Sequence, residues 1–549
     1  MTHVCRLPSA VCRLPSHVSR LTTHDSTLTF IRMKRNCLFI FVALHLFIFS
    51  SAQNDEPDRV MMQKIREEGL NHSQVMSIAH YLTDVAGPRL TNSPGYIHAS
   101  EWAVSTLKSW GLKNAQLEPW GVFGPGWTME KCYVAMKAPY YHPIIAYPFA
   151  WTKGTSGLLN AEVVMISKLD VDSIRKYGTL LKGKIILPHQ NDTLLRSAFY
   201  AYATRYADSV LLNIPDTYMI NAEQLKGMMS MINNLRRAIN LLQQMGAVAL
   251  LNMSNGNRDG TVDASAWWSG KKGASPELLT LSMSPEDYLR IQRLIQSKIK
   301  VQLELDIKSK TNNEDENGKN VIAEIPGTDP LLKDEIVMIG AHLDSWYSGT
   351  GATDNGAGCA VMMEVMRILK TMNVQPRRTI RIALWSGEEQ GLLGSYGYIR
   401  KHFGDPSTMN LLPDQSKVSA YYNLDNGTGK IRGIFLQNNQ AAQPIFKKWF
   451  EPFTDLGATT VSISNTGSTD HFSFDAIGIP AFQFIQDPME YETRTHHTNM
   501  DTYDHLSGED LKQAAVIGAA FVYNTAMREE KLPRKSLPSP KPWLFDLFK

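Results

Sequence analysis

The fold follows from residues 336–385, IVMIGAHLDSWYSGTGATDNGAGCAVMMEVMRILKTMNVQPRRTIRIALW. Ile336–Gly340 and Thr379–Trp385 are short apolar runs bounded by turn residues, which is typical of buried strands. Between them, Gly356–Thr371 carries apolar residues at helical spacing. Strand, helix and strand in this order predict two parallel strands joined by a crossover helix.

The same alternation continues towards the C-terminus. Further strands are predicted at Val418–Leu424 and Ala481–Ile485, and further helices at Leu392–Lys401, Ala442–Asp455 and Gly508–Met527. Repeated alternation of this kind predicts an α/β fold with a doubly wound, mostly parallel sheet and helices on both faces. Sheets of this class bind ligands beyond the carboxyl ends of their strands.

The part of the chain before residue 321 has a different pattern of apolar residues. Residues 57–118 have apolar positions at helical spacing, whereas 125–300 contain short strands at Ala161–Ile166, Lys184–Leu187 and Ala247–Leu251 and a helix around Met228–Met245. The polar run Lys308–Asn320 is interpreted as a linker or exposed hairpin. The expected domains are therefore N-terminal helices of the catalytic domain (53–124), a smaller β-rich insert (125–304), the catalytic domain (305–530) and a C-terminal tail (531–549).

The first 52 residues differ from folded protein. Residues 1–32 repeat Cys-Arg-Leu-Pro and are interpreted as an extension upstream of the true start at Met33. Residues 33–52 then give Lys34-Arg35, an apolar run Leu38–Phe49 and Ser50-Ser51-Ala52, the order of a signal peptide. The run is about 12 residues, too short to span a bilayer as a helix. We expect cleavage after Ala52, a secreted or periplasmic protein and no stable membrane anchor.

Composition and charge exclude several classes of protein and partner. Of 549 residues, 43% are hydrophobic and 20% charged, which excludes a disordered chain, collagen and a multi-span membrane protein. The formal net charge is +3. Since residues 1–52 hold six basic and one acidic residue, the remainder carries 50 − 52 = −2. A nearly neutral chain has no electrostatic footprint for nucleic acid, so we expect no nucleic-acid partner.

Candidate metal ligands follow the predicted strands. They are His342 and Asp344 in His-Leu-Asp, Asp354 at the head of a helix, Glu388-Glu389, Asp425, and His496-His497. Imidazole and carboxylate donors without thiolate suit zinc or a similar divalent ion in an open, catalytic site. The nearby glycine-rich loop lacks the Lys-Ser/Thr of a phosphate-binding P-loop.

The number of donors suggests two ions bridged by one carboxylate, for which Asp354 is the candidate. One ion is then assigned to His342 and Asp425, and the other to Glu389 and His497, with His496 as the second choice for the histidine. Because successive side chains of an extended segment point to opposite sides, one of Glu388 and Glu389 ligates and the other is free to accept a proton. The Asp344 carboxylate is expected to accept the far imidazole N–H of His342.

Together these motifs resemble peptidase family M28, the co-catalytic di-zinc exopeptidases. The resemblance rests on His342–Trp346, Ala352–Gly358, Leu384–Gly391, Asn423–Asp425 and His497–Thr502. It implies two Zn²⁺ ions, Asp354 as the bridge, Glu388 as general base and His497 as the ligating histidine. It also implies that Ser468–His471 and Gly478–Ala481 wall the substrate pocket, and that the insert is a protease-associated domain, carried by Lys182–Ile185 and Gly246–Ala249.

The function implied by the resemblance is that of a zinc-dependent exopeptidase. The expected substrates are small peptides or dipeptides cleaved near a free amino terminus, with a carboxypeptidase as the alternative and a homodimer as a possible assembly. A non-catalytic binding module is disfavoured because such a relative would be expected to have lost ligands, and all five are present. A glutaminyl cyclase shares part of the ligand set but typically lacks the insert.

Overall fold

The computed structural model describes residues 55–191, 201–254, 259–265 and 278–541. The predicted upstream extension (1–32) and signal peptide (33–52) lie outside these ranges. Within them, no helix has both the length and the apolar character needed to cross a membrane.

The first of two large sheets has eight strands and forms the centre of the catalytic half. Its central strands β12, β11, β15 and β18 are parallel, and antiparallel strands β10 and β16 flank them. The predicted α/β class is confirmed, with a mixed sheet. The spatial order is β1 (Lys113–Val122), β10 (Asn317–Ile325), β12 (Thr379–Trp385), β11 (Ile336–His342), β15 (Val418–Asn423), β18 (Ala481–Gln486), β16 (Ile431–Phe435) and β17 (Thr460–Ser462).

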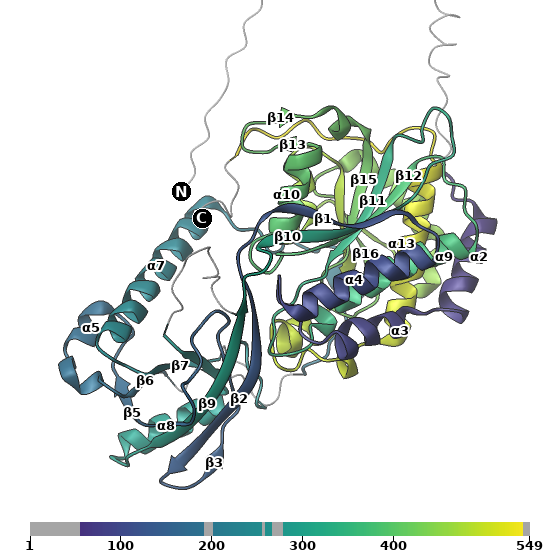
Figure 1. The fold of residues 1–549 in the computed structure, drawn as a ribbon. Helices are drawn as coiled ribbons and strands as arrows, with labels where there is room; N and C mark the ends of the chain where they lie inside the picture. Colours follow the sequence, from purple (N-terminus) through teal and green to yellow (C-terminus); the bar gives the residue numbers. More distant parts are fainter. Residues whose placement is uncertain (1–54, 192–200, 255–258, 266–277, 542–549) are drawn as a thin grey trace, which may run out of the picture. The chain divides into compact units, whose positions relative to one another are not determined.

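Helices cover both faces of this sheet (Figure 1). Alternate residues of a strand point to opposite faces, and β11 is buried along its whole length. Val337 and Ile339 therefore join one core with α9 and α13, whereas Ile336 and Met338 join another with α10 and α12. The helices of this half are α2 (Arg59–Asn71), α3 (Val75–His80), α4 (Pro94–Ser109), α9 (Ala357–Thr371), α10 (Leu393–His402), α11 (Gln443–Phe450), α12 (His471–Asp475) and α13 (Gly508–Met527).

The four predicted strands and four predicted helices of residues 336–527 are all present. The helical interpretation of 57–118 is correct for α2, α3 and α4 but wrong for its last residues, because β1 begins at Lys113. Ala115 and Leu117 pack on the core at a spacing of two, and Gln116 and Leu117 pair antiparallel with β10. The short strands β16 and β17 were not predicted.

The second sheet lies in the insert and also has eight strands. Strands β5 to β8 are parallel, and the predicted strands at 161–166, 184–187 and 247–251 correspond to β5, β6 and β7. The order is β3 (His142–Pro143), β2 (Gly126–Ala138), β9 (Gln302–Asn312), β5 (Leu159–Ile166), β6 (Ile185–Pro188), β7 (Ala249–Met253), β8 (Thr280–Met283) and β4 (Ala146–Pro148). Its helices are α5 (Val171–Arg175), α6 (Asp208–Leu211), α7 (Ala222–Gln244) and α8 (Pro285–Gln296).

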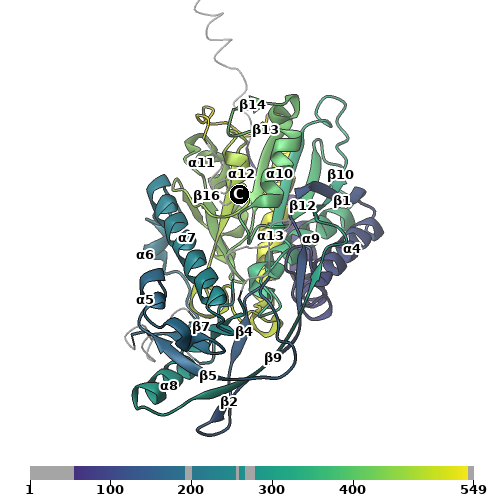
Figure 2. The ribbon, with the colours of Figure 1, turned by 60° about the vertical axis from the view of Figure 1, so that its left-hand side comes forward.

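A two-stranded ribbon joins the two halves. Lys308–Asn320 links the two sheets, as one of the two interpretations had it, but it is not a hairpin, because β9 pairs with β2 in the second sheet while β10 pairs with β1 and β12 in the first. The chain passes from β1 into β2 and from β9 into β10 through short turns. Figures 1 and 2 both show β2 and β9 as neighbouring strands that lead away from the first sheet.

The first residues of the predicted C-terminal tail contact the first sheet. Residues 531–541 contain no helix or strand, but Leu532 is buried. The Arg534 guanidinium donates to the carbonyl oxygens of Gly478 and Val418 at 3.1 and 2.6 Å. These contacts fasten the chain end beside β15.

Candidate active site

The structure brings all five predicted metal ligands together at the carboxyl ends of the parallel strands. His342 is the last residue of β11, and Asp354 lies with non-helical backbone in the turn Ala352–Gly356 that leads into α9. Glu389 follows β12, and Asp425 follows β15. His497 comes after the turn Tyr491–Thr495 and has left-handed backbone, with φ of 61°. Non-glycine residues adopt that conformation rarely, and mostly where surrounding structure imposes it.

Asp354 lies at the centre of the group. Its Oδ1 is 3.2 Å from Nε2 of His342, and its Oδ2 is 3.2 Å from Nε2 of His497. His342 Nε2 is also 3.1 Å from Asp425 Oδ1, and His497 Nε2 is 2.9 Å from Glu389 Oε2. The donors therefore form two sets that share the Asp354 carboxylate.

The second candidate histidine lies at the edge of this group. His496 Nε2 is 3.9 Å from Asp354 Oδ2, and its Nδ1 faces Glu492 at 3.7 Å. His497 is closer to Asp354, at 3.2 Å, and also contacts Glu389. The geometry favours His497 as the donor.

The donor group fits a divalent cation. Asp354 Oδ2 and Glu389 Oε1 are buried and accept no hydrogen bond from the described residues. Burial raises the pKa of Glu389 to about 7; the charge of Asp354 adds to the rise and His497 opposes it. Anions crowded in this way are unfavourable unless a proton or a cation neutralises them, and carboxylate with imidazole is a donor set that zinc accepts.

Glu388 lies beside the donors without joining either set. Its Oε2 is 3.9 Å from His342 Nε2. Burial raises its pKa well above the ordinary value, with the charges of Asp425 and Asp470 adding to the rise and His342 opposing it. A carboxylate with these surroundings, one residue from a metal donor, is placed to hold a proton at the site.

The role predicted for Asp344 is wrong in one respect. His342 Nδ1 lies 2.9 Å from the Asp344 carbonyl oxygen but 3.7 Å from its carboxylate, so the main chain fixes the imidazole. The carboxylate instead accepts the backbone N–H groups of Glu388 and Glu389 at 3.2 and 3.3 Å, and the Thr91 hydroxyl at 3.0 Å. Asp344 is therefore a positioning residue for the Glu388-Glu389 turn, with its carboxylate beside the His342 ring.

Two buried residues that sequence reasoning missed hold the loops of the site. Arg89 donates to four carbonyl oxygens, those of Leu82, Leu343, Thr350 and Gly351, at 2.7–2.8 Å. Asp501 accepts the N–H groups of Thr353 and Asp354 at 2.6 and 3.1 Å. Burial raises the pKa of Asp501 to about 7, and the Asp354 charge adds to the rise. Asp501 belongs to the quoted His497–Thr502 motif, whereas nothing near Arg89 in sequence marked its role.

A pocket of about 250 Å³ opens onto the donors. Of the two segments expected to wall it, Ser468 and Thr469 do so, but Ile479 and Ala481 lie in the core on one face of the first sheet. The carboxylates among its described lining residues are Asp354, Glu388, Glu389, Asp425 and Glu492. That lining contains no lysine or arginine. Tyr218 and Ile220, from the insert, also line it.

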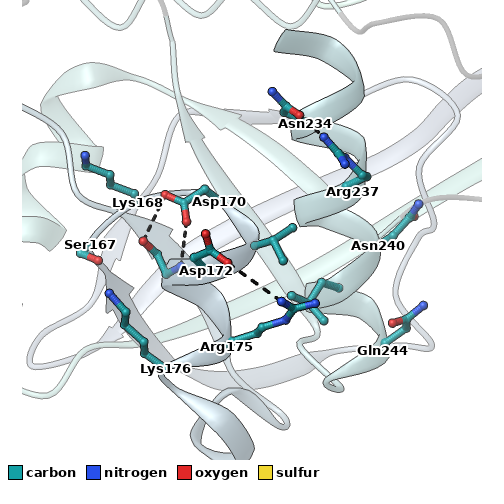
Figure 3. A pocket seen from close by; sticks show the side chains of 13 residues that line it. Ser167, Lys168, Asp170, Asp172, Arg175, Lys176, Asn234, Arg237, Asn240 and Gln244 are labelled. Carbon is teal, nitrogen blue, oxygen red and sulfur yellow. Dashed lines mark hydrogen bonds and ion pairs between the residues drawn. The ribbon is translucent and has the colours of Figure 1, made fainter. Parts of the chain in front are cut away.

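A wider cavity of about 1040 Å³ lies on the insert between α5 and α7 (Figure 3). Its side chains include Lys168, Asp172, Arg175 and Arg237, and Arg175 lies 4.0 Å from Asp172. No histidine lines it. The groups of metal donors in the described part of the chain both lie at the first sheet.

Fold and site together define an α/β protein with a cluster of candidate metal donors at its strand ends. Residues 320–522 match the family described as Peptidase family M28, so the chain carries a domain of this peptidase family and is a hydrolase by that membership.

Similar proteins and solved structures agree with this family match. Carboxypeptidase Q from Mus musculus is 25% identical over 525 residues, covering 91% of this chain and 100% of that protein. Aminopeptidase YwaD from Bacillus subtilis is 34% identical over 220 residues, covering 39% and 46%. Among solved structures, a peptidase M28 precursor from Shewanella amazonensis has a TM-score of 0.65 and 25% identity, covering 88% of this chain and 99% of that one. The predicted family is confirmed, and the similarity to carboxypeptidase Q extends along most of the chain.

We predict that Arg89→Leu lowers the free energy of unfolding by about 3 kcal/mol or more, because each buried carbonyl left without a donor costs about 1–3 kcal/mol. Urea unfolding measures the change. Arg59→Leu is the matched control, since Arg59 is 66% exposed and pairs with Glu451 at the surface; we expect a change below about 1 kcal/mol there. Equal losses in the two variants would contradict the role of Arg89.

Proposed function

We propose that this protein is a zinc-dependent exopeptidase that cleaves the peptide bond next to a free amino terminus, as an aminopeptidase or dipeptidase. The observation that carries the proposal is the lining of the pocket, where the described residues present five carboxylates and no lysine or arginine. The negative lining favours a substrate ammonium group, and without a lysine or arginine it offers no cationic partner to a substrate carboxylate.

Two zinc ions are proposed at the donor sets. His342 and Asp425 would hold one, Glu389 and His497 the other, and Asp354 would serve both. When bound, such ions polarise a carbonyl oxygen and lower the pKa of water towards about 7.

The chain's own residues supply proton transfer and positioning. Glu388 accepts a proton and later returns it to the leaving amine, since it lies beside the donors without occupying either set. The Asp344 carboxylate and the Thr91 hydroxyl hold the turn that carries Glu388: Asp344 accepts the Glu388 N–H, and Thr91 accepts the Gly387 N–H at 3.0 Å. This fixes the carboxylate before the substrate arrives.

A carboxypeptidase is the second candidate, favoured by the end-to-end similarity to carboxypeptidase Q. Recognition of a free substrate carboxylate would be expected to use a lysine or arginine. The described lining of the pocket offers neither, which places this candidate second. We also propose export through the signal peptide and a protease-associated character for the insert.

Elemental analysis tests the metal assignment. The purified protein should contain two zinc ions per chain. Replacing Asp354 by Ala removes the shared donor and should strip or strongly weaken both ions. His497→Ala should lose one ion, and His496→Ala should keep both. Retention of two ions in the Asp354 variant would refute the bridge, and loss in the His496 variant alone would exchange the histidines.

The proton-transfer role predicts the behaviour of Glu388→Gln. Glutamine keeps the size and removes the basicity, so zinc content should be unchanged while kcat falls by about 10²- to 10⁴-fold. Steady-state kinetics beside zinc analysis measures both. Loss of zinc would make Glu388 a ligand and Glu389 the base, and an unchanged kcat would remove both from this role.

Substrate polarity is tested with one dipeptide in three forms: free, N-acetylated and C-amidated. We expect the free and amidated forms to be hydrolysed and the acetylated form to lose at least tenfold in kcat/KM, because acetylation removes the positive charge that the negative lining attracts and adds the bulk of the acetyl group. Hydrolysis of the acetylated form with rejection of the amidated one would establish the carboxypeptidase instead.

A further inference from the structure

A segment of the insert, residues 201–221, crosses to the catalytic half; we call it the strap. Thr204 forms an antiparallel bridge with Met489, and Thr217 forms a parallel bridge with Thr466. Arg205 pairs with Asp487 and Asp510 at 2.9 and 2.8 Å. The strap is thus held at both ends by residues more than 200 positions away in sequence.

Apolar and capping contacts fix the strap between these ends. Leu211 and Ile214 pack in a small core with Phe435 and Ile485. The strap ends at Asn221, whose side chain caps α7 by accepting the N–H groups of Glu223 and Gln224. Because its position is set by packing as well as by charge, the strap is a fixed wall of the pocket.

Tyr218 of the strap spans the mouth of the pocket. Its carbonyl oxygen accepts the Ser468 hydroxyl at 2.9 Å on one side. Its own hydroxyl donates to Glu492 Oε1 at 2.6 Å on the other. A hydrogen bond of this length to a carboxylate is a strong, charge-assisted one, and it orients the Glu492 side chain at the pocket rim.

Glu492 is the pocket carboxylate left without a role in the proposed metal site. Its side chain is 44% exposed, and its ion-pair partner among the described residues is His496, at 3.7 Å.

The separation of Glu492 from the metal donors suits the reach of a basic side chain. One imidazole ring separates it from Asp354, since His496 contacts Glu492 through Nδ1 and approaches Asp354 through Nε2 at 3.9 Å. The α-amine of a substrate lies one carbon from the scissile carbonyl, whereas a lysine ammonium lies at the end of a four-carbon stem. Tyr218 and Ile220 offer apolar surface on which such a stem packs.

We propose that Glu492, oriented by Tyr218 of the insert, is a specificity-determining residue that favours substrates whose first residue has a cationic side chain. This rests on the proposed cleavage next to a free amino terminus. The insert thereby contributes directly to substrate selection.

The test compares lysyl-leucine with norleucyl-leucine, which differ at the end of the first side chain by the ammonium group. In the wild type, kcat/KM should favour the lysyl substrate by about 3- to 10-fold, the effect of one partly exposed charge pair. Glu492→Gln should abolish the preference, and Glu492→Lys should reverse it towards glutamyl-leucine. Inhibition constants of free lysine and norleucine give the same comparison without turnover.

Controls separate this proposal from its premise. Glu509→Gln removes one exposed charge at the start of α13, outside the pocket, and should retain both the activity and the preference. Tyr218→Phe should reduce the preference by a smaller factor than Glu492→Gln. If wild type and Glu492→Gln showed the same preference for the lysyl substrate, the role of Glu492 would be overturned. If Tyr218→Phe kept the full preference, the role of Tyr218 would be overturned. Failure of the amino-terminal premise would show separately, as equal hydrolysis of acetylated norleucyl-leucine.

Discussion

The convergence of carboxylates at one edge of a parallel sheet is the constraint on which this structure depends. Strands β11, β12 and β15 end side by side, so the side chains that follow them meet at short distances. His342 and His497 each contact the Asp354 carboxylate, and Glu389 and Asp425 complete the two sets. Burying so many anions is unfavourable without a compensating charge. The site is therefore built to hold cations, which is what a hydrolytic metal centre requires.

Buried ionisable side chains outside the two donor sets hold this arrangement in place. Arg89 bonds four carbonyl oxygens of the loops before Asp354, and Asp344 and Asp501 accept backbone N–H groups of the turns that carry Glu388, Glu389 and Asp354. Their charges act on the main chain, so the donors keep their own lone pairs free. A donor set fixed in this way needs little rearrangement on binding an ion.

The insert is part of the catalytic surface as well as an accessory domain. The ribbon of β2 and β9 carries it away from the first sheet, and the strap returns to that sheet through Thr204 and Thr217. Two attachments at separate places restrain the insert more than one would. This explains how Tyr218 reaches a pocket otherwise built from residues beyond 353.

The sequence by itself determined four strands and four helices of residues 336–527, the candidate metal donors and the family, because these depend on local periodicity and on residues placed at strand ends. Only the tertiary structure decided the rest. The pairing of β1 with β10, the clamp made by Arg89, the true partner of Asp344 and the contact of Tyr218 with Glu492 join residues that local patterns do not relate. Such contacts arise from packing and from the satisfaction of buried polar groups across the whole chain, and no short window of sequence encodes them.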